Sequence, residues 1–178
     1  VEVTGIDTKE KKLKLDNGED LPYEKVVLAT GASSFLPPIE NLRTANNVIG
    51  LRNLDDAIRI KEIAPKVKNI IILGAGLVGV DAMAGLLDYD AKVTMIEMGD
   101  RILPLQLDHY AANVYIERLK EEGVDFRFNV RAEKVIVDEN NNPVAIKLNT
   151  GEEVPGELII ACTGVRSNVG FLEGSGIE

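Results

Sequence analysis

Residues 70–81 read Ile-Ile-Ile-Leu-Gly-Ala-Gly-Leu-Val-Gly-Val-Asp, and residues 92–97 read Lys-Val-Thr-Met-Ile-Glu. The first apolar run ends at a glycine, which predicts a buried strand over 69–73 followed directly by a turn. Small and apolar residues continue after the turn and predict a helix over 77–87. The second apolar run predicts another buried strand over 92–96. This strand–helix–strand order is typical of an α/β domain with a parallel sheet.

Three glycines inside this unit, Gly74, Gly76 and Gly79, have the G-x-G-x-x-G spacing of a dinucleotide site. The first permits a tight turn, the second lets a pyrophosphate approach the backbone, and the third lets the helix lie close to the strand. The helix N-terminus then offers N–H groups and a partial positive charge to the phosphates. The alternative is a glycine-rich turn in an ordinary α/β domain, and the complete strand–helix–strand context argues against it.

Glu97 ends the second predicted strand, 18 residues after Gly79. A carboxylate at this place accepts hydrogen bonds from both hydroxyls of an adenosine ribose and repels a 2′-phosphate. Charge-assisted hydrogen bonds contribute about 1.5–3 kcal/mol, so we predict a preference of roughly tenfold to a hundredfold for NAD over NADP. The alternative interpretation is an exposed acid at the end of a strand.

The composition limits the partners. The chain has 178 residues, 45% hydrophobic and 28% charged, which is ordinary for a globular domain. The net charge of −9 argues against nucleic acid and anionic membranes. A single cysteine excludes an internal disulfide and fits a reducing compartment, so we expect a cytoplasmic protein. No apolar run reaches membrane-spanning length and no signal peptide is visible.

The remaining pattern predicts two meanders around the central unit. Pro37-Pro38 and the polar run after them favour a connector without helix or ladder, and we expect a domain boundary there. Because the chain lacks an initiating Met and begins in the middle of a strand-like pattern, we interpret it as part of a longer protein. The other expected elements are strands over 1–6 and 12–15, a buried strand over 25–30, a connector over 31–50, helices over 54–64 and 107–122, a strand over 124–128, a meander over 133–154 and a buried strand over 157–161.

Three blocks of the sequence resemble the pyridine nucleotide–disulfide oxidoreductase superfamily, whose members are flavoproteins with two dinucleotide sites. The resemblance covers essentially the whole chain and is closest to the NADH oxidases, coenzyme A disulfide reductases, nitrite reductases and ferredoxin or rubredoxin reductases. It implies a Rossmann-like, three-layer FAD/NAD(P)-binding α/β fold with a parallel sheet plus an antiparallel β-meander. The blocks are Tyr23–Ala32 with Pro37-Pro38, Gly74–Asp81 with Glu97 and Asp100–Pro104, and Leu158–Asn168 with Phe171-Leu-Glu behind it.

The resemblance also implies a domain layout. Residues 1–37 are expected to be a remnant of the FAD-binding domain, with its meander and its Ala-Thr-Gly strand. Residues 38–162 are expected to be the NAD-binding domain, and residues 163–178 the segment that returns toward the FAD domain.

Site residues follow from the same resemblance. Leu77 stands where many members carry an aromatic ring over the nicotinamide, and Asp81 where many carry Glu. Arg101 is expected near the adenosine, with a solvated loop charge as the alternative, and Thr163 and Gly164 near the nicotinamide, with a bare turn as the alternative. The expected NAD contacts are Gly74, Gly76, Leu77, Val78, Gly79, Asp81, Glu97, Arg101, Thr163 and Gly164. The expected FAD contacts are Val3, Ala29, Thr30 and Gly31.

Two further residues are not assigned to chemistry. Cys162 has no partner cysteine and ends a buried strand, which favours a small apolar core thiol. His109 lacks companions at ligand spacing, so no metal site is expected.

The implied function is hydride transfer from NADH to FAD and then to an acceptor, either a small molecule or a small redox protein. In this chain we expect no catalytic acid, base or nucleophile, because its residues bind and orient the cofactors. The chain alone is expected to bind NAD without turnover. The missing FAD-binding segments are its expected partners, and the family resemblance is also compatible with a homodimer. The first alternative is a regulatory NAD-sensing Rossmann module without a redox step. A single-domain dehydrogenase is the second, but its catalytic His, Lys or Tyr constellation is not found.

Overall fold

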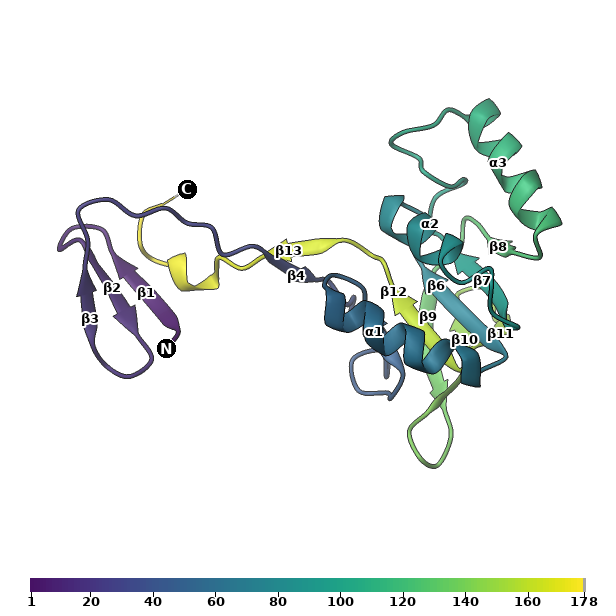
Figure 1. Ribbon diagram of the computed structural model, residues 1–178, viewed down its shortest axis with the longest axis horizontal. Helices are drawn as coiled ribbons and strands as arrows, with labels where there is room; N and C mark the ends of the chain where they lie inside the picture. The colour runs from purple at the N-terminus through teal and green to yellow at the C-terminus, as the bar shows by residue number, and fades with distance from the viewer. Residues whose placement is uncertain (178) are drawn as a thin grey trace. The chain divides into compact units, whose positions relative to one another are not determined.

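The computed structural model describes residues 1–177 and shows two compact units. The larger unit consists of residues 34–164, and the smaller unit combines residues 1–33 with 165–177. Both are drawn in Figure 1.

A five-stranded parallel sheet forms the centre of the larger unit, in the order β5-β12-β6-β7-β8. The predicted strands at both ends of the glycine unit are confirmed residue for residue, as β6 and β7. The sheet consists of β5 (Val48–Gly50), β6 (Asn69–Leu73), β7 (Lys92–Ile96), β8 (Asp125–Arg127) and β12 (Leu158–Ala161).

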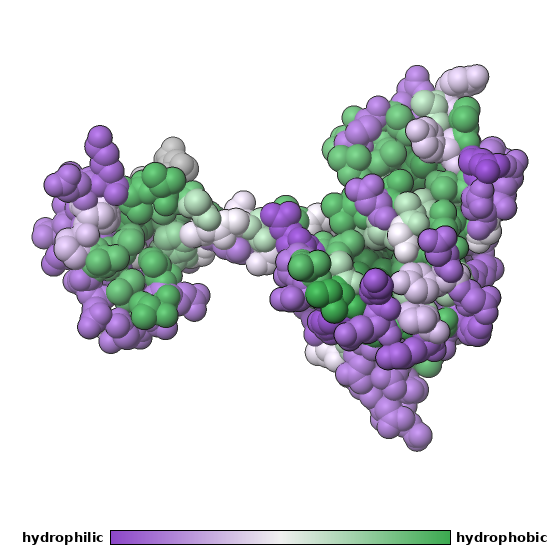
Figure 2. All heavy atoms as spheres, viewed as in Figure 1, coloured by the Kyte–Doolittle hydropathy of each residue, from purple (hydrophilic) through white to green (hydrophobic). Residues whose placement is uncertain are grey.

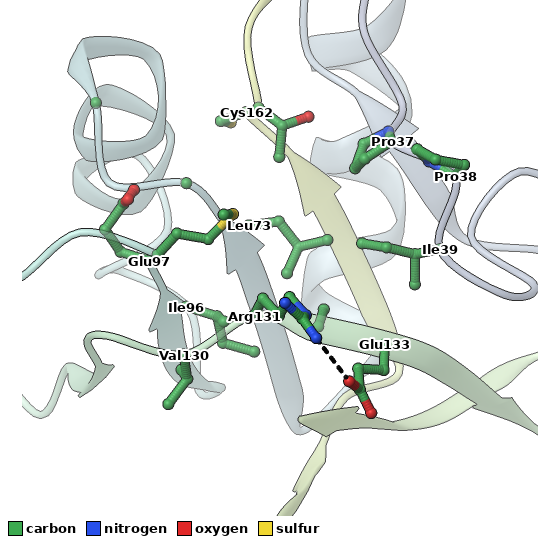
Figure 3. Close-up of a pocket in the computed structure, with 15 residues that line it drawn as sticks. Pro37, Pro38, Ile39, Leu73, Ile96, Glu97, Val130, Arg131, Glu133 and Cys162 are labelled. Carbon is green, nitrogen blue, oxygen red and sulfur yellow. Dashed lines mark hydrogen bonds and ion pairs between the residues drawn. The ribbon is translucent and has the colours of Figure 1, made fainter. Parts of the chain in front are cut away.

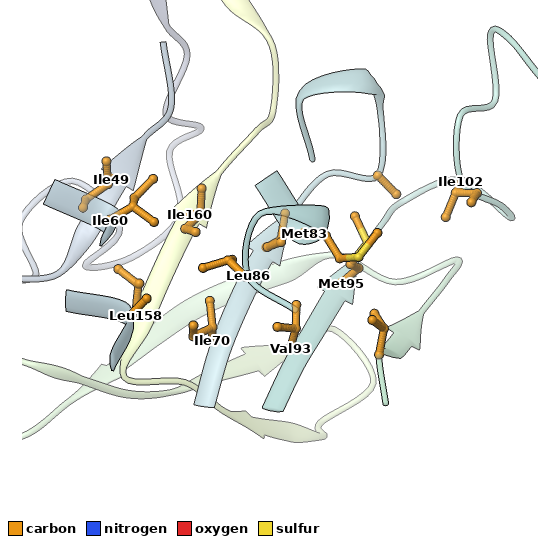
Figure 4. Packing of buried hydrophobic residues seen from close by; sticks show 14 of the residues in the cluster. Ile49, Ile60, Ile70, Met83, Leu86, Val93, Met95, Ile102, Leu158 and Ile160 are labelled. Atoms are coloured by element: carbon orange, nitrogen blue, oxygen red, sulfur yellow. The ribbon is translucent and has the colours of Figure 1, made fainter. Parts of the chain in front are cut away.

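Alternate side chains of the central strands enter two different cores, because successive residues of a strand point to opposite faces. Ile70 and Ile72 of β6 share a core with buried residues of the helices α1 (Leu54–Ile63), α2 (Leu77–Ala84) and α3 (His109–Glu121). Figure 4 shows Ile70 in this core with Ile60 of α1 and Met83 of α2. Ile71 and Leu73 pack on the other face. A strand that is buried on both faces therefore reads as the continuous apolar run that the sequence displays.

An antiparallel meander supplies the second core. Its strands β9 (Ala132–Val137), β10 (Pro143–Leu148) and β11 (Glu153–Pro155) are ordered β11-β10-β9. Val135 and Ile146 are fully buried in this core. The tip of the β9–β10 hairpin carries hydrophilic residues, which Figure 2 shows as a protruding purple lobe. Helices, parallel sheet and meander give the predicted three-layer fold.

The helices begin and end at recognisable signals. The side chain of Asn53 accepts a hydrogen bond from the backbone N–H of Asp56, and Asp56 bonds back, which completes a capping box at the start of α1. Pro65 lies in the short 3-10 turn η1 (Ala64–Lys66) that follows. Helix α2 ends three residues earlier than predicted because Gly85 closes it with a hydrogen bond to the carbonyl of Asp81.

The smaller unit contains a second antiparallel meander, ordered β1-β2-β3. Its strands are β1 (Val3–Asp7), β2 (Lys12–Leu15) and β3 (Asp20–Pro22), and a short 3-10 turn η2 (Gly170–Leu172) belongs to the same unit. Of the hydrophobic side chains described in this unit, only Ile6 is buried. Two more short strands, β4 (Ala32–Ser34) and β13 (Val165–Ser167), pair with each other.

Two predictions about secondary structure are wrong. Residues 25–30 are not a strand and are mostly exposed, with Val27 88% exposed, because no strand of the described chain lies beside them to complete a ladder. The expected connector over 31–50 contains the strands β4 and β5, since Ile49 is buried beside β12 at the edge of the parallel sheet. Among residues 1–177, no helix combines the length and hydropathy that a membrane crossing requires.

Candidate dinucleotide site at the carboxyl ends of the parallel strands

Two of the three glycines are required by the fold itself. Gly74 has φ +96°, and a Cβ built on it would lie 2.5 Å from the carbonyl oxygen of Cys162. The N–H of Gly74 donates to the carbonyl of Ile96 at 2.8 Å. A Cβ on Gly79 would overlap the carbonyl oxygen of Gly74. The turn is thus packed tightly between the ends of β6, β7 and β12.

Gly76 is different from the other two. It is the N-cap residue of α2, its φ is negative, and a Cβ built on it would meet no heavy atom within 4 Å. Neither backbone conformation nor packing within the chain therefore explains a glycine at this position. The space that a side chain would occupy is open, and Gly76 lies on the wall of a cavity.

The cavity has a volume of about 610 Å³ and lies at the carboxyl ends of β6, β7 and β12, where α/β sheets bind their ligands. Leu73, Ile96 and Cys162 mark these three ends in Figure 3. The size is within the range of small-molecule sites. Its wall is formed by Pro37, Pro38, Ile39, Leu73, Gly74, Gly76, Ile96, Glu97, Met98, Val130, Arg131, Ala132, Glu133, Cys162 and Thr163.

Glu97 has a structural role that the sequence did not reveal. One carboxylate oxygen, Oε2, accepts a hydrogen bond from the N–H of Ala75 at 2.8 Å, and the other, Oε1, accepts one from the N–H of Gly99 at 2.7 Å. Glu97 therefore fixes the glycine turn to the end of β7. Each carboxylate oxygen can accept more than one hydrogen bond, so both oxygens keep capacity for a ligand.

The structure places several expected NAD residues outside the cavity wall. Leu77 and Val78 are 57% and 48% exposed in the first turn of α2. Asp81 lines a separate hollow of about 210 Å³ between α1 and α2. Of the ten expected residues, only Gly74, Gly76, Glu97 and Thr163 line the cavity.

Arg101 is bound into its own loop. Its Nε donates to the carbonyl of Leu107 at 3.1 Å, one terminal nitrogen donates to the carbonyl of Pro104 at 3.1 Å, and the other pairs with Asp100 at 2.8 Å. The side chain is 20% exposed. These contacts tie the guanidinium to the segment before α3, and the expected place of Arg101 near the adenosine stays a prediction.

Thr163 and Cys162 follow β12 on the cavity wall. The hydroxyl of Thr163 donates to the carbonyl of Phe35 at 2.6 Å. Cys162 packs against the core between the parallel sheet and the helices, called the helix-side core below. Burial raises the pKa of its thiol to about 12. The thiol therefore stays protonated at neutral pH and is a poor nucleophile. Within the described residues, no three His, Cys, Asp or Glu side chains are grouped so as to hold a metal ion.

Sequence reasoning missed part of the wall. Val130 and Arg131 lie in the loop after β8, where the rule that ligands collect at the carboxyl ends of parallel strands could have found them, whereas Ala132 and Glu133 begin the antiparallel strand β9. Arg131 pairs with Glu133 at 3.4 Å, the dashed contact in Figure 3. Residues 37–39 could not be found by their position after a strand, since they belong to a segment without helix or strand.

The expected FAD residues lie in the smaller unit. Val3 is in β1, opposite Leu15 of β2. Thr30 and Gly31 have exposed, irregular backbone, and Gly31 has φ +66°. Asn168 donates to both of their carbonyl oxygens, through its side-chain Nδ2 to Thr30 and through its backbone N–H to Gly31, each at 3.0 Å.

Comparison with known proteins identifies the family. The sequence model described as "Pyridine nucleotide-disulphide oxidoreductase" matches residues 1–178. The NADH-dependent phenylglyoxylate dehydrogenase subunit epsilon of Aromatoleum evansii is 32% identical over 93% of this chain and 38% of its own length. The NADH oxidase of Enterococcus faecalis is 28% identical over 97% of this chain and 39% of its own length. The chain thus spans about two fifths of these curated relatives.

Solved structures agree with the sequence comparison. The structure of an NAD-dependent persulfide reductase from A. fulgidus is similar with a TM-score of 0.90 and 31% identity, over 99% of this chain and 33% of that one. A covalent putidaredoxin reductase–putidaredoxin complex contains a chain that is similar with a TM-score of 0.92 and 25% identity, over 99% of this chain and 43% of that one. The predicted fold and family are confirmed: the chain belongs to the pyridine nucleotide-disulphide oxidoreductase family.

Proposed function

We propose that this chain holds NAD(H) in the cavity, as part of an FAD-dependent oxidoreductase that passes hydride from NADH to FAD and on to an acceptor. The observation that carries the proposal is Gly76, whose missing side chain leaves open space on the cavity wall. A pyrophosphate needs such a place, where it can touch the backbone. Helix α2 begins here, and Gly76 supplies no side chain to satisfy its first N–H groups.

Glu97 supports NAD as the nucleotide. Its carboxylate is fixed by the N–H groups of Ala75 and Gly99, so its orientation is set before a ligand arrives. Ribose hydroxyls donate to it, whereas a 2′-phosphate would meet a like charge. We therefore propose a preference for NAD over NADP of tenfold to a hundredfold, on the order of one or two hydrogen bonds to a charged group.

FAD is proposed to lie against the smaller unit. Ala29, Thr30 and Gly31 are exposed residues that belong to no strand, and Val27, two residues before Ala29, has an exposed apolar side chain. Such a segment suits the edge of a large, partly apolar group. Bound FAD would supply the hydride-accepting chemistry, while the residues of this chain bind and orient the two cofactors. The proposal includes the layout that the family implies, with residues 1–37 and 163–178 on the FAD side and 38–162 on the NAD side, and Pro37 and Thr163 at its two boundaries also line the cavity.

The acceptor is proposed to be a small molecule or a small redox protein. The rubredoxin-NAD(+) reductase of Alcanivorax borkumensis is 29% identical over the whole of this chain, and its name specifies a small redox protein as partner. No titratable group of the cavity wall is asked to act as acid, base or nucleophile, because hydride transfer needs none.

A glycine substitution tests the nucleotide site. In the full-length protein, Gly76→Ala puts a methyl group into the cavity without a clash inside the chain, so NADH affinity should fall at least tenfold, while the poorer N-cap should lower the unfolding free energy by only about 1 kcal/mol. Gly170→Ala is the matched control, because its Cβ also meets no heavy atom within 4 Å and lies in the smaller unit. Equal NADH affinity in Gly76→Ala and wild type would contradict the proposed site.

Nucleotide titration and flavin colour test the rest. The purified full-length protein should be yellow and should bleach when NADH is added. Its dissociation constant should be lower for NADH than for NADPH, and Glu97→Gln should narrow that difference. A colourless protein that binds NADH without flavin would instead support a regulatory NAD-sensing module.

A further inference from the structure

Asn168 holds a four-residue stretch of the smaller unit through three hydrogen bonds. Its Nδ2 donates to the carbonyl of Thr30 at 3.0 Å, and its backbone N–H donates to the carbonyl of Gly31 at 3.0 Å. Its Oδ1 accepts the hydroxyl of Ser33 at 2.8 Å. These contacts join positions separated by more than 130 residues of sequence.

The bond from the N–H of Asn168 to Gly31 adjoins the β4–β13 pair, whereas Thr30 lies beyond it. Residues 25–30 belong to no strand of the described chain, so β-pairing does not fix their backbone. A primary amide is suited to the task because one planar group carries a donor and an acceptor. The hydroxyl of Ser33 donates to the amide oxygen Oδ1, and this contact orients the amide so that Nδ2 donates to the carbonyl of Thr30. The backbone at 30–31 is thereby set by a residue that is distant in sequence.

We propose that Asn168 is a positioning residue for the flavin, which keeps the backbone of Ala29, Thr30 and Gly31 in the conformation that receives FAD. This inference rests on the proposed function, since it assigns Asn168 to the FAD side of that reaction. Asn168 acts through the Ala-Thr-Gly backbone and is not itself assigned a contact with the cofactor. Ser33 orients the amide and belongs to the same arrangement.

The test is an FAD titration of the full-length apoprotein. Asn168→Asp keeps the shape of the side chain but places a carboxylate oxygen against the carbonyl of Thr30, so FAD affinity should fall about tenfold. Ser33→Ala removes one neutral hydrogen bond and should weaken FAD about threefold, in line with the modest net contribution of such a bond. Asn17→Ala is the matched control, because Asn17 also makes two exposed side-chain hydrogen bonds in the same unit, both to Glu19, and FAD affinity should not change.

Two further readouts separate positioning from a general loss of stability. The visible circular dichroism of the bound flavin should change in Asn168→Asp, because the ring lies in an altered backbone environment, whereas the NADH dissociation constant should equal that of wild type. Ser33→Thr retains a hydroxyl and should restore the affinity lost in Ser33→Ala.

The outcomes distinguish the two proposals. Wild-type FAD affinity and an unchanged flavin spectrum in Asn168→Asp and Ser33→Ala would overturn the role of Asn168 and leave the proposed function intact. A wild-type protein that takes up no FAD would overturn the proposed function itself. If Asn168→Asp does not fold, Ser33→Ala decides the question with the same readouts.

Discussion

Two segments of the chain have nearly the same sequence pattern and different structures. Residues 25–31 read Lys-Val-Val-Leu-Ala-Thr-Gly, and residues 158–164 read Leu-Ile-Ile-Ala-Cys-Thr-Gly. The second segment forms β12 in the middle of the parallel sheet, with Ile159 and Ile160 fully buried. The first forms no strand, and Val27 is almost fully exposed.

Their turns are nevertheless alike. Gly31 has φ +66° and Gly164 has φ +101°, so each segment ends in a left-handed glycine. A turn depends on local sequence, whereas a strand depends on neighbours that supply hydrogen bonds and a surface to pack on. β12 has β5 on one side and β6 on the other. Substitutions at matched positions can therefore measure what the neighbours contribute.

The largest difference is expected in the reactivity of a thiol at position 29 and at position 162, the residues that precede Thr-Gly in the two segments. Cys162 has a pKa raised by burial to about 12 from the ordinary 9.0, while Ala29 is exposed. In a Cys162→Ala background, Ala29→Cys should react with iodoacetamide at pH 8 roughly a thousandfold faster than wild-type Cys162, because only the thiolate reacts. Comparable labelling rates would mean that Cys162 is not desolvated.

The same pKa sets a pH dependence. The folded thiol keeps its proton between pH 9 and 12 and the unfolded thiol loses it, so the contribution of Cys162 to stability is complete below pH 9 and falls as pH rises through that range. Cys162→Ala should lose this alkaline dependence, which unfolding titrations at pH 8 and pH 10 would reveal.

The next largest difference is expected in the stability lost when Ile160 and Val27, which occupy matched positions of the two segments, are truncated to alanine. Ile160→Ala leaves a cavity in the helix-side core and should lower the unfolding free energy by about 3–4 kcal/mol. Val27→Ala in the 178-residue chain should change it by less than about 0.5 kcal/mol, because the side chain is exposed. Denaturant unfolding of both variants measures the difference. A cost for Val27→Ala that appears only in the full-length protein would show that residues 25–30 gain a neighbour there.

A smaller difference in stability is expected between Gly31 and Gly74, the left-handed glycine that follows the neighbouring strand β6. Gly74→Ala combines a left-handed φ with a Cβ 2.5 Å from the carbonyl oxygen of Cys162, and should cost about 2–3 kcal/mol. Gly31→Ala has the left-handed φ but no heavy atom within 4 Å, and should cost about 1 kcal/mol. Equal losses in thermal or denaturant unfolding would show that the contact with Cys162 relaxes freely.

The same contrast explains what could be predicted from the sequence. The central strands and the glycine turn were predicted because short-range pattern decides them. The strand over 25–30 was predicted wrongly and β5 was missed, because both outcomes depend on which strands lie alongside. In the candidate site, sequence spacing drew attention to Gly76 and Glu97. The hydrogen bonds from Ala75 and Gly99 to Glu97 could not be predicted, because they depend on three-dimensional contacts. The same is true of the bonds that Arg101 makes within its own loop.

The matched threonines provide the smallest and sharpest difference. The hydroxyl of Thr163 donates to the carbonyl of Phe35 at 2.6 Å, so Thr163→Val, which keeps the shape, should cost about 1 kcal/mol of unfolding free energy. The side chain of Thr30 is exposed, and Thr30→Val should have an effect within about 0.5 kcal/mol. Because the two substitutions are chemically identical, their difference in denaturant unfolding isolates the single hydrogen bond. A cost at Thr30 as large as that at Thr163 would mean that both Thr-Gly turns are held by the hydroxyls of their threonines, even though residues 25–31 form no strand.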